Sequence, residues 1–271
     1  MIAIFLEYIW LPLAAVFVPV IFKIVGNRFL YIKEIKKKTS REINEFIDLY
    51  NTSIKDDVKI CVEEIIYFID NTNDDDMEHH LYICKKFNKT VGFIKFMISS
   101  TQKIIFIAYA GIDKTDKTAN KYGFKIMIKK LSKKYFKSKI ADCIITEIER
   151  NPSGGYSTPL SKLIARYSSN FKKQSFFIDF DYIQPNMPDN NFEKTNELLL
   201  SLVYIPYHTK RNNIISKEKL LGIIHTIYFD IYCPSCNEVS CCDCSQYNKY
   251  LEEIMSIYRS DLPENINLIK M

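Results

Sequence analysis

The stretch VGFIKFMISSTQKIIFIAYAGID, residues 91–113, decides the fold class of this 271-residue chain. It contains two runs rich in β-branched and aromatic residues, and the polar turn SSTQK separates them. This pattern predicts two consecutive antiparallel strands. The preceding run HLYICKKF, residues 80–87, has the same character. The middle of the chain is therefore predicted to be an antiparallel sheet.

The segments after residue 113 alternate between helical and extended patterns. Residues 113–136 predict a loop that opens into an amphipathic helix with a lysine-rich face. ADCIITEIER, residues 141–150, has the apolar run of a buried strand, and residues 160–171 predict another helix. Two strand-like runs follow, at residues 173–185 and 197–207. The order predicts an α+β fold with a mixed, mainly antiparallel sheet flanked by helices.

The first residues form an apolar stretch long enough to cross a bilayer. Residues 2–22 are interrupted only by Glu7, and about twenty apolar residues suffice for one spanning helix. Seven Lys and Arg residues follow between 23 and 41, and none precedes the stretch. The positive-inside rule then predicts a single-pass membrane protein whose body faces the cytoplasm. A hydrophobic helix buried in the domain or in a partner is the alternative.

The net charge bears on the kind of partner that the protein binds, and the distribution of cysteines bears on its redox compartment. Lysines on the solvent-exposed face of a helix explain the net charge of +5, so no nucleic-acid partner is expected. Three of the eight cysteines stand alone in apolar contexts and five lie between 233 and 244, a distribution that favours a reducing compartment.

The strand at residues 91–113 and the elements after it resemble the GNAT (GCN5-related N-acetyltransferase) superfamily, over roughly residues 55–232. The resemblance implies an acyl-CoA co-substrate, with acetyl-CoA as the expected donor, and an amine acceptor. It implies that the second strand of the pair receives the pantetheine arm, and that the next loop and helix start surround the pyrophosphate. The residues implied for donor binding are Ala108, Tyr109, Ala110, Gly111 and Ile112 on the strand, and Lys121, Gly123 and Phe124 after it. The family pattern Arg/Gln-x-x-Gly-x-Gly/Ala is degenerate here, since only Gly123 remains as a clear glycine.

The resemblance also implies catalytic residues. Tyr167, in RYSSNF, matches the tyrosine that protonates the departing CoA thiolate in that family, and the alternative is that it packs on a helix face. Glu147 and Glu149 leave the end of the strand at 141–150 and are the candidate bases. Strand alternation puts both on one face, opposite Ile148, where paired carboxylates would raise one pKa. A surface ion pair between Glu149 and Arg150 is the alternative.

A cysteine cluster near the C-terminus has the spacing of a metal site. Cys233, Cys236, Cys241 and Cys244 form C-x2-C-x4-C-x2-C, which predicts a structural zinc site with four thiolates. The four-residue spacer is short for two zinc knuckles. Reduced cysteines in a loop, or a reversible disulfide, are the alternatives.

These observations predict four regions: an anchor at 1–25, a juxtamembrane helical linker at 26–54, a GNAT-like domain at 55–232, and a Cys-rich loop with a C-terminal helix at 233–271. Two amphipathic helices are expected between Thr39 and Asp70. The expected function is N-acyl transfer at the cytosolic face of a membrane. The alternative is an inactive GNAT-like module that senses CoA or binds a protein there.

Overall fold

A computed structural model describes residues 30–37, 41–54, 62–70, 77–149, 164–165, 174–185, 198–208, 213–232 and 244–271. These residues build one sheet whose strand order is β1-β2-β3-β4-β5-β8-β6-β10-β9, with β7 paired to β8 off this path. Neighbouring strands are antiparallel except for β4 and β5, which are parallel. The predicted mixed, mainly antiparallel sheet is therefore confirmed.

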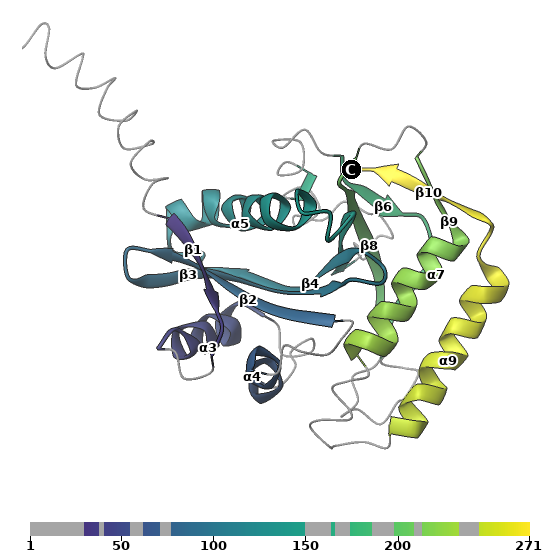
Figure 1. Cartoon of the computed structure of the whole chain (residues 1–271), viewed down its shortest axis with the longest axis horizontal. Coiled ribbons are helices and arrows are strands. Elements are labelled where there is room, and N and C mark those ends of the chain that lie inside the picture. The colour runs from purple at the N-terminus through teal and green to yellow at the C-terminus, as the bar shows by residue number, and fades with distance from the viewer. Residues whose placement is uncertain are drawn as a thin grey trace, which may run out of the picture.

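The first half of the sheet contains the three antiparallel strands expected from the sequence, together with one further strand at its edge. It consists of β1 (Leu30–Ile35), β2 (Met77–Lys86), β3 (Lys89–Ser99) and β4 (Ile104–Ile112). One face is covered by α3 (Glu42–Ser53) and α4 (Val62–Asp70), and the other by α5 (Lys117–Leu131), which continues as the π-helical segment η3 (Ser132–Phe136) (Figure 1). The two expected helices between Thr39 and Asp70 are thus α3 and α4.

The second half of the sheet is built from short strands and the C-terminal helices. Its strands are β5 (Cys143–Glu149), β6 (Phe176–Ile178), β7 (Tyr182–Gln184), β8 (Leu198–Pro206), β9 (Ile214–Ser216) and β10 (Asn265–Lys270). The helices are α7 (Lys217–His225), its π-helical continuation η5 (Thr226–Tyr232), and α9 (Cys244–Asp261). In Figure 1, α7 and α9 lie side by side next to these strands.

The core has three apolar clusters, one under each group of helices. Ile43, Phe46 and Tyr50 of α3 pack on Phe93 of β3, while Met127 and Leu131 of α5 pack on the opposite face. The third cluster joins α7, η5 and α9 to the strands around β8. Because α3 and α5 take opposite faces, alternate residues of each central strand point to different helices.

The structure differs from the sequence-based expectation at both ends of the described chain. Residues 30–35, expected to be part of a helical linker, form β1 and pair with β2 in register from Leu30 opposite Lys86. Residues 265–270 form β10, which bridges β6 and β9. Both terminal strands therefore belong to the same sheet as the central strands. Their hydrogen-bonding partners lie far away in the sequence.

Two adjacent histidines, His79 and His80, lie in β2, which begins at Met77. His79 is buried and stacks on Phe68 of α4, with ring centroids 4.3 Å apart. His80 points to the other face, where its ring nitrogens contact Glu34 and Glu78 at 2.8 and 3.1 Å. Within the described residues, no group of three His, Cys, Asp or Glu side chains could hold a metal ion.

Besides Tyr167 and most of the helix expected at 160–171, two further predictions lie outside the described residues. The apolar stretch 2–22 is one, and no helix of the described part is both long and apolar enough to span a membrane. The cysteine quartet is the other, because only the backbone of Cys244, at the start of α9, is described. The anchor and the zinc site therefore stay predictions.

Candidate active site

The parallel strands β4 and β5 separate at their C-terminal ends. Their pairing covers only Ile104–Ile107 against Cys143–Thr146, although both strands continue, to Ile112 and Glu149. The Thr146 hydroxyl closes the paired part by donating to the Ile107 carbonyl at 3.0 Å. Beyond this point the β5-facing backbone groups of β4 are not used by β5, which leaves them available to an extended ligand.

A β-bulge in β4 lies at the point of separation. In the β3–β4 ladder Phe96 is opposite Ile107 and Lys95 is opposite Tyr109, so Ala108 is the extra residue. Ala108 and Tyr109 consequently pack on the same side of the sheet, with the clusters under α7 and α3. The bulge bends β4 away from β5 and explains why the pairing stops there.

The five residues expected to bind the donor arm lie along the part of β4 that pairs with β3 but not with β5. Ala108, Tyr109, Ala110 and Ile112 are partly exposed. Gly111 is buried, and a Cβ added to it would lie 2.3 Å from the Phe93 ring and 2.9 Å from Ser53 Cβ. Its small size allows the C-terminal end of α3 to pack closely on β4.

The residues expected around the pyrophosphate have different positions. The helix α5 begins at Lys117, six residues before Gly123, so Gly123 lies in its second turn. There a Cβ would be 2.9 Å from Ile112 Cδ1, and Gly123 lets α5 approach β4. Phe124 is buried toward the sheet, while Lys121 is exposed. None of the three lies at the start of the helix.

The start of α5 is capped by a carboxylate. Asp116 Oδ1 accepts hydrogen bonds from the backbone N–H groups of Thr118 and Ala119, both at 2.9 Å. Asp116 also forms an ion pair with Lys86 at 2.8 Å, and its pKa is lowered by the hydrogen bond from this lysine, against the effect of burial. These amides correspond to those that bind pyrophosphate in the family that the sequence resembles, and here an anionic side chain occupies them.

Glu147 lies just past the point where β4 and β5 separate, and two phenols hold it. Tyr182 of β7 donates to its Oε1, and Tyr232 of η5 donates to its Oε2 at 2.6 Å. Tyr232 in turn accepts from Gln184 Nε2 at 3.0 Å. Both carboxylate oxygens therefore have a donor, each from a different element.

The enclosure changes the proton affinity of Glu147. Burial raises its pKa to about 7, although the hydrogen bonds from Tyr182 and Tyr232 act in the opposite direction. Burial also raises the pKa of each phenol well above the ordinary value, so both remain protonated donors. A carboxyl group that is half ionised near neutral pH is suited to accept a proton.

The other candidate base is in a different environment. Glu149 lies on the same face as Glu147, as the alternation predicted, while Ile148 packs in the cluster under α5. Glu149 is exposed, and Glu147 owes its raised pKa to burial rather than to a neighbouring carboxylate. Tyr167, the expected acid, lies outside the described residues.

Sequence reasoning missed Tyr182 and Tyr232. Tyr182 is fully buried and Tyr232 nearly so, and they come from segments 35 and 85 residues after Glu147. A second layer supports them, because Tyr228 donates to the Ile183 carbonyl at 2.5 Å and Ile183 N–H donates to Tyr258 of α9 at 2.7 Å. The only sequence signal was an unusual density of tyrosines between 182 and 258.

No protein-family model and no curated protein sequence matches the chain. Solved structures do match it. A protein from Bacteroides thetaiotaomicron assigned to the GNAT acetyltransferase family is 14% identical with a TM-score of 0.52, and the match covers 74% of this chain and 98% of that one. The acetyltransferase from Salmonella typhimurium that modifies the N-terminal serine of ribosomal protein L7/L12 is 12% identical, with a TM-score of 0.44 over 67% and 96% of the two chains. From the sheet order, the separated β4 and β5 and the first of these similarities, the chain has the fold of the GNAT acetyltransferases.

Proposed function

We propose that the protein is an acyl-CoA-dependent N-acyltransferase in which Glu147 is the general base. The observation that carries this proposal is the position of Glu147, with a pKa of about 7, at the separated ends of β4 and β5. The fold supports acyl transfer in general. Acetyl-CoA as donor and an amine as acceptor come from the resemblance of residues 91–113 to the family.

In the proposed reaction each catalytic side chain has one role. The acceptor nitrogen attacks the thioester carbonyl and forms the C–N bond, while the Glu147 carboxylate takes the proton that nitrogen loses. The C–S bond then breaks, and Tyr167 supplies the proton that CoA thiolate requires. Tyr182 and Tyr232 hold the carboxylate in place throughout. The β5-facing edge of Ala108–Ile112, which lies beyond the pairing with β5, would align the pantetheine arm beside it.

We also propose that residues 2–22 tether this enzyme to the cytosolic face of a membrane. The support is the length of the apolar stretch and the basic residues that follow it.

The test measures donor binding and turnover separately in the full chain. Calorimetry with acetyl-CoA reports binding, and a thiol assay with a mixture of amines reports CoA release. The proposal requires saturable binding together with amine-dependent release that Glu147→Gln abolishes. Absence of acyl-CoA binding would refute it.

A second candidate function is an inactive GNAT-like module that senses CoA or binds a protein, and the cap of α5 favours absence of turnover because it hinders a productively bound donor. Asp116 occupies the amides of Thr118 and Ala119, so phosphate groups of a donor would meet a carboxylate there. Binding of acetyl-CoA with no release of CoA for any amine would select this function. If Asp116 hinders the donor, Asp116→Asn should tighten acetyl-CoA binding, which the same calorimetry measures.

A further inference from the structure

Lysines are especially dense in α5 and in the residues that flank it. Residues 114–139 contain ten lysines and one acidic residue, Asp116, and so carry +9, whereas the whole chain carries +5. All other residues together therefore carry −4. Lysine stands at every fourth position over six repeats from Lys117 to Lys137, a spacing that places neighbours on one side of a helix.

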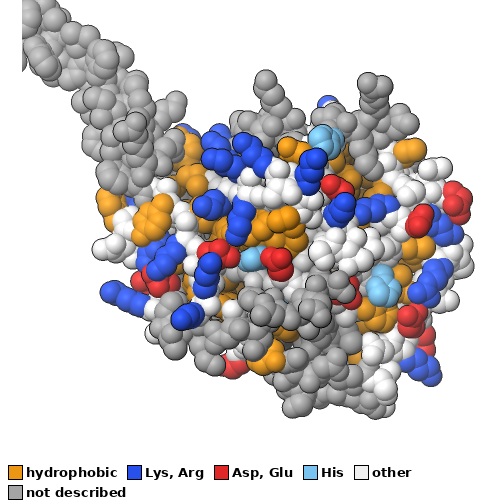
Figure 2. Space-filling view, in the orientation of Figure 1, with side chains coloured by type: hydrophobic (Ala, Val, Ile, Leu, Met, Phe, Trp, Pro, Cys, Tyr) orange, Lys and Arg blue, Asp and Glu red, His pale blue; other side chains and the backbone are white. Residues whose placement is uncertain are grey.

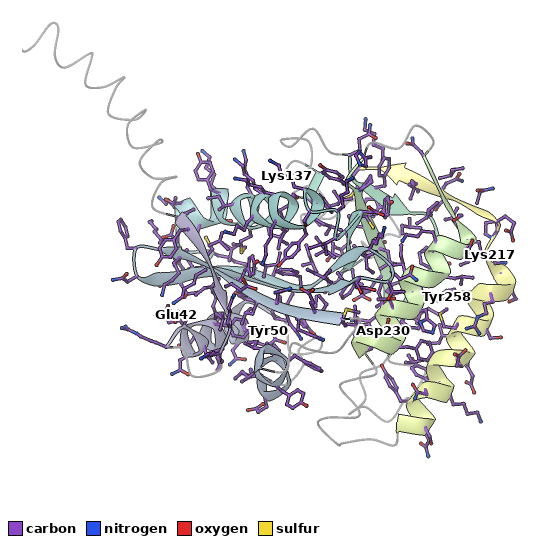
Figure 3. All side chains as sticks on the ribbon, in the orientation of Figure 1. Glu42, Tyr50, Lys137, Lys217, Asp230 and Tyr258 are labelled. Atoms are coloured by element: carbon purple, nitrogen blue, oxygen red, sulfur yellow. The ribbon has the colours of Figure 1, made fainter. Side chains whose placement is uncertain are left out.

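The structure shows that these side chains form a surface. The opposite side of α5 is buried on the sheet through Phe124, Met127 and Leu131. The α5 lysine face is defined here by its exposed members in α5, η3 and the residue after them, which are Lys117, Lys121, Lys129, Lys130, Lys133, Lys134 and Lys137. Blue side chains gather over α5 in Figure 2, and Figure 3 places Lys137 at the end of the helix that lies nearer the second half of the sheet.

Three of these lysines have no acidic neighbour in the part of the chain that the structure describes. Among the described residues, Lys129, Lys133 and Lys137 have no carboxylate within 4 Å, whereas the neighbouring Lys134 pairs with Glu34 at 3.6 Å. Like charges at spacings of three and four residues destabilise a helix slightly. An anionic partner on this face would remove that repulsion.

The position of Leu30, the first described residue, indicates which anionic surface can lie next to the α5 lysine face. Leu30 is buried in the same cluster as Phe124 and Ile128 of α5. Seven residues separate it from Phe22, the end of the apolar stretch, and the eight steps from Phe22 to Leu30 span at most roughly 28 Å when extended. A bilayer that holds residues 2–22 therefore lies within that distance of Leu30, on the part of the molecule that α5 covers.

We propose that the α5 lysine face docks on the anionic lipid headgroups of the bilayer that holds residues 2–22. The cytoplasmic leaflet is negatively charged, and each lysine within about 8 Å of it, the Debye length at physiological salt, is attracted. Docking through α5 turns the opposite face of the sheet, which carries Glu147, away from the lipid. The acceptor would then reach Glu147 from the water side. This inference rests on the proposed tether of residues 2–22 and does not depend on acyl transfer.

The test is lysine footprinting of the full chain in vesicles. The protein is reconstituted into phosphatidylcholine vesicles with and without 30% phosphatidylserine, treated with a water-soluble amine-reactive ester, and analysed by mass spectrometry. We expect Lys129, Lys133 and Lys137 to react at least about threefold more slowly with phosphatidylserine present. Salt at 0.5 M should remove this protection, because the screening length falls from about 8 Å at physiological ionic strength toward about 3 Å at 1 M. Lys249 and Lys270, exposed on α9 and β10, are internal controls that should not change.

Two double variants with the same change in charge test whether the protection depends on this surface or only on the net charge of the protein. Lys129→Glu/Lys133→Glu should abolish the protection of Lys137, and Lys249→Glu/Lys270→Glu should leave it intact. Equal reactivity in both lipids, or equal loss in both variants, would overturn the proposal. Protection of the same lysines by RNA in solution, without protection by phosphatidylserine, would assign the face to a nucleic-acid partner and also overturn it.

Discussion

At the residue scale, Glu147 combines a proton affinity suited to catalysis with a fixed position. Its pKa of about 7 results from burial, and two phenols donate to its oxygens. Glu149, two residues later on the same face, is exposed and lacks such an environment. The pair therefore provides a candidate base and a matched control.

Replacing Glu147 by Gln should lower turnover by a factor of about 10² to 10⁴, the usual contribution of a general base. The amide keeps the shape of the side chain and removes its ability to take a proton, so acetyl-CoA affinity should be unchanged. Steady-state CoA release and calorimetry measure the two quantities. Glu149→Gln is the control, and an equal loss of turnover in both variants would contradict the assignment.

Tyr232→Phe should shift the acidic limb of the pH–rate profile to higher pH. The Tyr232 hydrogen bond stabilises the ionised form of Glu147, so its loss raises the pKa of this carboxyl further. The profile of kcat/KM against pH measures the shift. Tyr31→Phe, a change at an exposed tyrosine of β1, should leave the profile unchanged. A shift to lower pH in Tyr232→Phe would contradict the proposed contact.

At the scale of the elements, the close contact of α3 with β4 depends on a residue without a side chain. A Cβ at Gly111 would lie 2.3 Å from the Phe93 ring, which is itself packed against Phe46 and Tyr50. This ring has no open space into which it could move.

Gly111→Ala should therefore lower the free energy of unfolding by about 1 to 3 kcal/mol, the cost of overpacking a core. Denaturant unfolding measures the change. Gly222→Ala is the matched control, because its Cβ would meet only the end of the Gln102 side chain, and alanine favours the helix α7. Equal stability of wild type and Gly111→Ala would show that α3 sits further from β4.

At the scale of the whole molecule, the C-terminal strand completes the sheet. Leu268 of β10 is buried opposite Ile178 of β6, and Ile266 is buried opposite Ile215 of β9. Leu268→Ala should cost about 2 to 5 kcal/mol of unfolding free energy, and the unfolding transition should remain single. The exposed Ile269→Ala should cost less than 1 kcal/mol. A separate early transition in Leu268→Ala would indicate that the C-terminal region folds independently.

The pH dependence of stability has contributions of opposite sign. Glu147 keeps its proton up to a pH of about 7 when folded and only to about 4.5 when unfolded. The folded state binds more protons in this window, so the contribution of Glu147 to stability falls as pH rises from 4.5 to 7, by roughly 3 kcal/mol. His79 acts oppositely, because burial lowers its pKa from 6.5 to about 3 and stability is lost as pH falls through that range.

The difference between wild type and Glu147→Gln isolates the first contribution. Relative to the variant, wild type should lose stability between pH 4.5 and 7, as measured by denaturant unfolding at several pH values. His79 is common to both proteins and cancels. A difference that does not vary with pH would show that Glu147 is solvated in the folded state.

The sequence by itself determined the central strands, the helices α3, α4, α5 and α9, and the face on which Glu147 lies, because these follow from local periodicity. It did not determine that residues 30–35 and 265–270 complete the sheet, since six-residue strands acquire their stability only from partners elsewhere in the chain. The convergence of Tyr182 and Tyr232 on Glu147 and the burial of His79 were likewise decided by the tertiary structure. Long-range packing determines which side chains lose water, and the loss of water determines the pKa of Glu147.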